Sequence, residues 1–460
     1  MPGACRQRIT MENLANWLKE NNITEVECIT PDQTGIARGK IMPTEKFIAE
    51  GGIRLPESVM LQTATGDYPH DELFYRLLDP ADIDMLLRPD EGAKFLVPWA
   101  LEPSAQIIHD CYDSAGKLIS LSPRATLKRV LDLYDDKGWS PIVAPEVEFY
   151  LTKRCTDPDF PLEPPMGRSG RQESGRQSFS IDAANEFDHI MEDVYDWCEQ
   201  MHLDIDTLIH EEGPAQMEFN FRHGAALKLA DQVFVFKRAV REAALKHNID
   251  ATFMAKPIAD EPGSAMHIHQ SLLDAKTGKN IFSNSDGTPS KAFFSYIAGL
   301  QTYMPQMMPM IAPNVNSYRR YLPSAAGNAP VNIEWGEENR TVGLRVPQSN
   351  ANNRRIENRL PGADTNPYLV LAGNLICGYL GIVQNLTPRE PVTGRHGEVT
   401  DPDIPFNLEA ALEVMANSEE IRDALGANFV DGFIGTRWAE YEGFKRVISS
   451  WEREYLLSTV

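Results

Sequence analysis

The sequence predicts an α+β protein with a small N-terminal domain and a larger second domain. Residues 41–118 alternate short apolar runs with proline and glycine, as small α/β domains do. Segment 250–362 has the pattern of several short strands joined by long loops, whereas 364–387 and 407–457 are mainly helical in pattern. A boundary is expected within "AGKLISLSPR", which divides the chain into residues 1–118 and 119–460.

The individual elements follow from local signals in chain order. Residues 11–22 have the amphipathic pattern of a helix, and "TEVECIT" (24–30) and the segment after "PDQTGIARGK" are expected to form a β-hairpin. "SPRATLKRVLDLYDDKG" (122–138) begins with Ser–Pro and ends with Gly, which predicts a helix. Residues 155–177 are rich in Pro, Gly and Arg and predict a loop, followed by helices at about 182–202 and 225–247.

Composition excludes several classes of protein. The formal net charge of −22 argues against a nucleic-acid binder, which needs a basic face. The six cysteines are scattered without paired spacing, which favours a reducing compartment. The N-terminus lacks the pattern of a signal peptide, and the apolar stretch 367–384 is interrupted by Asn374, as expected of a buried helix. We therefore expect a cytoplasmic enzyme without a nucleic-acid or membrane partner.

Four segments place charged residues at strand period with apolar residues between them. Because alternate side chains of a strand share a face, the apolar set is expected to face the core and the charged set to face a polar or ionic environment. The charged residues are Glu146 and Glu148, then Glu211 with Glu218, then His267 and His269, and finally Arg355, Glu357 and Arg359.

This combination of residue types points to metal and phosphate chemistry. Carboxylates on a buried face are tolerated only when they are paired or bind a metal. Oxygen-rich ligand sets suit Mg²⁺ or Mn²⁺, and a histidine favours Mn²⁺ slightly. Each pattern by itself is more typical of a solvated strand face or a core histidine pair. The joint presence of all four favours a single site.

The segments "EVEFYL", "EEGPAQMEFNF", "GSAMHIHQSL", "APNVNSYRRYLP", "ENRTVGLRVP" and "RRIENRLPGADTNPYLVLAG" occur in an order that resembles the glutamine synthetase family over nearly the whole chain. The resemblance implies a small β-grasp-like N-terminal domain and a catalytic domain with an open, mainly antiparallel β-barrel. It also implies a homo-oligomer, a dodecamer of two hexameric rings with active sites between subunits. Two or three Mg²⁺ or Mn²⁺ ions per site and ATP as co-substrate are expected.

The resemblance also implies a role for individual residues. One metal would be held by Glu148, Glu211 and Glu218, and a second by Glu146, His267 and Glu357. ATP would contact Phe221, His269, Ser271, Arg345 and Arg355, and glutamate would contact Gly263 and Arg320. Arg340 and Arg359 would neutralise the transferring phosphoryl group as catalytic residues.

One loop departs from the family members that use ammonia. Those relatives carry Pro-Gly-x-Glu-Ala-Pro, whereas this chain reads "PSAAGNAP" (323–330), with Asn328 in place of the acid. Asn cannot take a proton from ammonium, so a bulkier amine is favoured. Alternatively, Asn328 is an ordinary loop residue, and Glu337 or Glu338 substitutes for the missing acid.

The sequence resembles in particular the gamma-glutamylputrescine and gamma-glutamylpolyamine synthetase branch. The predicted reaction joins the γ-carboxylate of glutamate to putrescine, spermidine or a similar amine through γ-glutamyl phosphate, in polyamine catabolism. The alternatives are glutamine synthesis from ammonia and ligation to a monoamine such as ethanolamine. An inactive family member is disfavoured because the glutamates, His267 and the arginines are all present.

Overall fold

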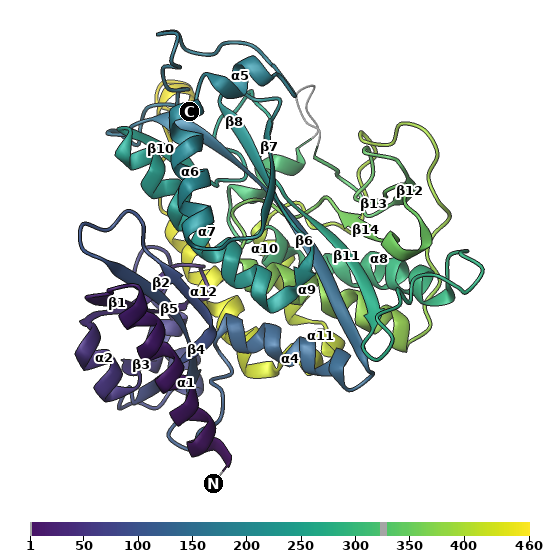
Figure 1. Cartoon of the computed structure of the whole chain (residues 1–460). Coiled ribbons are helices and arrows are strands. Elements are labelled where there is room, and N and C mark those ends of the chain that lie inside the picture. Colours follow the sequence, from purple (N-terminus) through teal and green to yellow (C-terminus); the bar gives the residue numbers. More distant parts are fainter. Residues whose placement is uncertain (1, 323–328) are drawn as a thin grey trace.

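The computed structural model describes residues 2–322 and 329–460 (Figure 1). Its N-terminal part is built on a sheet with the strand order β2-β1-β5-β4-β3. These strands are β1 (Glu25–Pro31), β2 (Ala37–Pro43), β3 (Ile53–Pro56), β4 (Asp84–Leu96) and β5 (Ser104–Tyr112). The expected hairpin is confirmed, since β1 pairs antiparallel with β2, whereas β1 and β5 are parallel.

Strands β1 and β5 are buried on both faces. Cys28 and Ile107 belong to a small core that also contains Leu14 of α1 (Pro2–Glu20) and Phe47 of α2 (Thr44–Glu50). Their chain neighbours Ile29 and Ile108 point the other way and belong to the large core of the rest of the chain. The N-terminal sheet therefore lies between its own helices and the second part of the molecule.

The second sheet is larger and has the order β12-β13-β14-β11-β6-β8-β7, with β9 and β10 also paired to β6. All of its printed pairings are antiparallel except that of β12 with β13. Long β6 and β11 run side by side through the centre of Figure 1. The bounds are β6 (Trp139–Lys153), β7 (Ile205–His210), β8 (Gln216–Phe221), β9 (Gly224–Ala225), β10 (Ile249–Thr252), β11 (Met266–Asp274), β12 (Trp335–Glu337), β13 (Leu344–Val346) and β14 (Ile356–Asn358).

Helices cover the apolar face of this sheet. Val147, Phe149 and Ile268 are fully buried in one core with α4 (Pro123–Asp135), α7 (Ala226–Lys246), α8 (Lys291–Ile311) and α9 (Pro367–Val383). Because strand side chains alternate, this burial turns the intervening charged residues towards the opposite face. The remaining helices are η1 (Glu57–Leu61), α3 (Asp71–Leu77), α5 (Ile181–Asn185), α6 (Asp188–Gln200), η2 (Ser317–Tyr321), η3 (Ala351–Asn353), α10 (Leu408–Ala416), α11 (Glu419–Leu425), α12 (Ala427–Lys445) and α13 (Ser450–Leu456).

Asn374, which interrupts the apolar stretch, connects α9 to the sheet. Its Oδ1 accepts hydrogen bonds from Gln270 Nε2 of β11 at 2.9 Å and from Asn358 Nδ2 of β14 at 2.7 Å. Both donors are adjacent in sequence to predicted site residues, so this buried amide fixes the strands that carry them. Among the described residues, no helix has the length and apolar character needed to cross a bilayer.

Two expected elements differ from the structure. Segment 250–362 contains the 21-residue helix α8, where loops and short strands were expected. The helix expected at about 182–202 is interrupted between α5 and α6, where Glu186 forms the C-cap of α5. The prediction that 407–457 is mainly helical is confirmed by α10, α11, α12 and α13.

Candidate active site

Matched positions on neighbouring strands bring the charged side chains to one face of the second sheet. Directly paired residues on adjacent strands project to the same side, so their side chains lie close together. The pairs are Glu146 with His267, Glu148 with Glu218, and His269 with Glu357. The alternating pattern in the sequence therefore becomes a continuous polar surface across β14, β11, β6 and β8.

A cavity of about 460 Å³, here called the acidic cavity, opens on this face. The described residues of its wall all follow position 145. The predicted site residues in its wall are Glu146, Glu148, Glu211, Glu218, Gly263, His267, Arg320, Arg340, Arg345, Glu357 and Arg359.

Three carboxylates of the acidic cavity form a group suited to a divalent cation. One oxygen from each of Glu148, Glu211 and Glu218 lies within 4.8 Å of the others. Burial, with the charge of Glu211, raises the pKa of Glu148 to about 8, and burial also raises the pKa of Glu211. Burial and the charges of Glu146, Glu148 and Glu211 raise the pKa of Glu218 well above its usual range. Such mutual repulsion is relieved by a bound cation, so the residues fit a metal.

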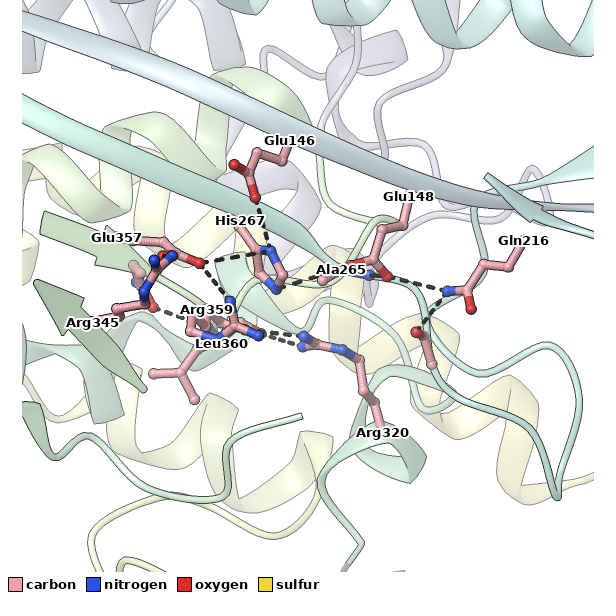
Figure 2. A network of polar contacts seen from close by, with 12 residues as sticks. Glu146, Glu148, Gln216, Ala265, His267, Arg320, Arg345, Glu357, Arg359 and Leu360 are labelled. Carbon is pink, nitrogen blue, oxygen red and sulfur yellow. Dashed lines mark hydrogen bonds and ion pairs between the residues drawn. The ribbon is translucent and has the colours of Figure 1, made fainter. Parts of the chain in front are cut away.

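Glu146 is the centre of a second group. It forms close groups of possible ligand atoms with Glu218 and His267, and with His269 and Glu357. His267 Nδ1 lies 3.2 Å from Glu146 Oε2 and 3.9 Å from Glu357 Oε1 (Figure 2). Burial would raise the pKa of Glu146, but hydrogen bonds from the two histidines outweigh it and hold that pKa well below its usual range.

The imidazole of His267 is suited to ligation because it is held neutral. Burial, together with the charge of Arg359, lowers the pKa of His267 to about 4. A neutral imidazole offers a free lone pair, which is the form that binds metal ions. The predicted second ligand set of Glu146, His267 and Glu357 is thus brought together, and His269 lies beside it.

Two arginines hold Glu357 ionised at the edge of this group. Arg345 Nη1 and Arg359 Nη1 donate to its two oxygens at 2.7 and 2.5 Å (Figure 2). Burial would raise the pKa of Glu357, but Arg359 and His267 outweigh it and lower that pKa to about 2. The Nε atoms of Arg345 and Arg359 are buried and have no partner among the described residues.

Gly263 and Arg320 form another part of the wall. A Cβ at Gly263 would lie 2.6 Å from the Ala255 carbonyl oxygen and 2.8 Å from Arg320 Cγ, so a side chain does not fit there. Arg320 is only 5% exposed and donates to the carbonyl oxygens of Arg359 and Leu360 (Figure 2). Its position in the 3₁₀-helix η2 is therefore buried, not a solvated helix end.

A second cavity of about 820 Å³ adjoins the first. Phe221, His269, Ser271 and Arg355 line it, and these are four of the five residues predicted to contact ATP. Arg355 Nε donates to His269 Nδ1 at 3.3 Å, and His269 Nε2 lies 2.8 Å from Glu146 Oε1. The fifth, Arg345, lines the acidic cavity instead.

Some residues of the site were not predicted. Gln216 Nε2 donates to Glu148 Oε2 at 3.2 Å and to the Gly263 carbonyl oxygen at 3.1 Å. Gln216 lies two residues before Glu218, so the strand period could have identified it. Asn220, which lines both cavities, follows the same spacing. Asn328 lies outside the residues that the structure describes.

Comparison with known proteins agrees with this geometry. Residues 120–456 match the glutamine synthetase catalytic domain. The chain is 33% identical to gamma-glutamylputrescine synthetase PuuA of Escherichia coli (strain K12), over 95% of this chain and 92% of that one. It is 31% identical to a glutamate–isopropylamine ligase of Pseudomonas sp, over 95% of each chain. A solved structure described as "Apo GmaS without ligand" has a TM-score of 0.81 at 26% identity, and covers 97% of this chain and 99% of its own.

A carboxylate-rich cavity next to a histidine- and arginine-lined one, carried on this fold, defines the class: the chain belongs to the glutamine synthetase family. Within that class it is an enzyme, an ATP-dependent glutamate ligase. The family uses divalent metal ions as well as ATP, and the acidic groups described above fit such ions. The predicted family and the α+β fold class are confirmed.

Proposed function

We propose that this ligase joins the γ-carboxylate of glutamate to an amino group of a di- or polyamine such as putrescine or spermidine. The observation that carries the proposal is the likeness to gamma-glutamylputrescine synthetase over 95% of this chain. Asn328 in place of the acid of ammonia-using relatives supports it, because an amide cannot accept the proton of ammonium. The proposed setting is polyamine catabolism in the cytoplasm.

We propose the following roles for the site residues. Glu148, Glu211 and Glu218 would hold one divalent ion, and Glu146, His267 and Glu357 another, as Mg²⁺ or Mn²⁺. Gly263 and Arg320 would bind glutamate, and Phe221, His269, Ser271, Arg345 and Arg355 would bind ATP. Bound metal ions supply charge neutralisation on the phosphates.

The side chains of the acidic cavity account for activation of the acid. A carboxylate is a poor acyl donor, and transfer of the γ-phosphoryl group of ATP to glutamate makes γ-glutamyl phosphate. Arg340 and Arg359 line the cavity, and their cationic groups would neutralise the moving phosphoryl group. The deprotonated amine then attacks the γ-carbonyl carbon and phosphate leaves. The carboxylates of the cavity favour approach of a cationic amine.

The test is a panel of amines assayed with ATP, glutamate and Mg²⁺ by release of phosphate. We expect the highest kcat/KM with putrescine or spermidine and a much lower value with ammonium. A preference for ammonium over every amine would overturn the proposal in favour of glutamine synthesis. Omission of the amine provides the control for ATP hydrolysis without ligation.

A monoamine acceptor is the second candidate. It is favoured by the likeness to a glutamate–isopropylamine ligase at 31% identity. Isopropylamine and ethanolamine belong in the same panel, and a clear preference for either would identify a monoamine ligase. The two candidates differ in the distal end of the acceptor, which is a second cation in a diamine and an uncharged group in a monoamine.

We also propose that residues 1–118 and 119–460 are separate domains and that the enzyme assembles as a dodecamer with active sites between subunits. Within one chain, the described walls of both cavities contain no residue from the N-terminal part. That part of the chain is therefore available to complete the site of a neighbouring subunit. Light scattering coupled to size-exclusion chromatography measures the subunit number.

A further inference from the structure

The turn between β7 and β8, residues 211–215, is held by an irregular segment that precedes α5. We call this segment, residues 173–179, the clamp segment. The side chain of Glu173 is 5% exposed, and its Oε2 accepts a hydrogen bond from the Ala215 backbone N–H at 2.7 Å. The same oxygen lies 3.0 Å from Nε2 of His210, whose side chain is fully buried. One carboxylate thus spans both ends of the turn.

Two further contacts join the clamp segment to the same turn. The Phe179 backbone N–H donates to the His210 carbonyl oxygen at 2.8 Å, and Arg176 Nη1 donates to Glu212 Oε1 at 3.0 Å. Phe179 and Ala215 both adopt left-handed backbone conformations, with φ of 61° and 56°. Such conformations are unfavourable for these residue types and persist where surrounding contacts fix them.

The His210 ring connects the clamp segment to the main chain of Glu211. Its Nδ1 lies 2.8 Å from the Glu211 carbonyl oxygen, while its Nε2 faces Glu173. The two ring nitrogens thus face two oxygen atoms, one on the main chain of Glu211 and one on the side chain of Glu173. The ring is thereby anchored at both nitrogens, and the main chain of Glu211 is anchored with it.

We propose that Glu173 is a positioning residue for the divalent-metal site, acting through His210 and Ala215 on Glu211. The inference rests on the proposed function, in which Glu211 is a metal ligand. Glu173 Oε1 is buried without a described partner, which carries an energetic cost. Groups that orient a metal ligand typically change metal affinity by about 10- to 100-fold when they are removed.

The test is Mn²⁺ binding to the full-length protein after chelator treatment, measured by electron paramagnetic resonance of the free ion. Glu173→Ala is expected to weaken binding by about 10- to 100-fold. Glu173→Gln is expected to weaken it less, because its amide oxygen still accepts the Ala215 N–H. Glu163→Ala is the matched control from the same irregular stretch, since Glu163 pairs with Lys153 and both side chains are exposed. It should bind Mn²⁺ like the wild type.

Unchanged Mn²⁺ affinity in Glu173→Ala would overturn the proposal. A smaller number of Mn²⁺ sites with unchanged affinity at the remaining sites would also overturn it, because that pattern indicates partial unfolding. A thermal melt of each variant detects such unfolding. Absence of Mn²⁺ binding by the wild-type protein is a different failure. It would overturn the metal role of Glu211, and therefore the proposed function on which the proposed role of Glu173 depends.

Discussion

Burial and the charges of neighbouring glutamates both raise the pKa of Glu218. This side chain is 4% exposed, and three other glutamates raise its pKa in addition to burial. Such an arrangement costs stability in the absence of a cation, so its retention is best explained by ligand binding. Removal of such a residue is therefore expected to lower activity without lowering stability.

We expect Glu218→Ala to lower kcat/KM by at least about 10³-fold with every amine, because charge stabilisation of the transferring phosphoryl group is lost. The thermal midpoint should stay the same or rise, since a repelled carboxylate is removed. Phosphate release and a thermal melt measure the two effects. Full activity would contradict the metal role of Glu218, and a large fall in the midpoint would contradict the repulsion.

A second prediction at the residue scale concerns His109, which is fully buried in the N-terminal part. Its Nδ1 lies 2.8 Å from the Ile107 carbonyl oxygen, and Phe47 packs edge-on against its ring. Burial lowers the pKa of His109 to about 4, whereas the backbone hydrogen bond with Ile107 and the charge of Asp110 raise it by less. The ring is neutral in the folded protein but gains a proton below about pH 6.5 when unfolded.

The neutral ring therefore contributes stability above about pH 6.5, and that stability is lost as the pH falls towards 4. The loss should reach about 2 kcal/mol at pH 5 from this residue. Urea unfolding at pH 7 and pH 5 measures it in the wild type and in His109→Gln. The variant should lose less stability between these pH values, and an equal loss would contradict the prediction.

At the scale of elements, α8 and α9 cross at glycines. A Cβ on Gly299 of α8 would lie 2.2 Å from the Cys377 carbonyl oxygen and 2.7 Å from Gly381 Cα of α9. A Cβ on Gly381 would meet the Ser295 carbonyl oxygen at 2.1 Å. The two backbones are too close for any side chain, and this contact sets the position of the helices behind the catalytic sheet.

Gly299→Ala should therefore destabilise the protein by about 3 kcal/mol or more through overpacking. Gly443→Ala, in α12, is the matched control because its Cβ would have no neighbour within 4 Å. Alanine is the better helix former, so the control should be neutral or stabilising by up to about 1 kcal/mol. Urea unfolding compares the two, and equal stability of both variants would rule out the close crossing.

Element types were predictable from sequence where periodicity was clear. Alternation in β6 and β11 correctly indicated which residues face the core, because one face is apolar and the other charged. The helix α8 was missed because Pro305 and Pro309 lie inside it and its apolar residues surround the whole helix. Neither a period nor a polar face was available to identify it.

At the scale of the molecule, a buried charge network joins the N-terminal sheet to the helices. Arg124 of α4 is 1% exposed and contacts Asp90 of β4, Asp110 of β5 and Asp231 of α7. Tyr368 of α9 donates to Asp231 at 2.7 Å and completes the network. Four elements from both parts of the chain thus meet at one guanidinium group.

Arg124→Met should destabilise the protein by about 3–5 kcal/mol, because it leaves three carboxylates without their common cation. Arg76→Met is the control: Arg76 pairs with Asp431 and is 61% exposed, so the expected cost is at most about 1 kcal/mol. Thermal or urea unfolding distinguishes the two. Equal effects would mean that the Arg124 network does not hold the two parts together.

Sequence could not reveal the long-range features of the site. Glu173 and His210 are 37 positions apart, and no local pattern joins a loop glutamate to a strand histidine. The grouping of His269 with Glu146 and Glu357 likewise depends on the register of three strands. Local periodicity predicts which face a residue occupies, whereas packing decides which residues on that face meet.

Glu146 and Asn220 are paired across β6 and β8, and both line the acidic cavity and the second cavity. The two cavities therefore meet at these two side chains. A molecule bound in either cavity would contact the same two side chains. The boundary between the two cavities is thus formed in part by one residue pair of β6 and β8.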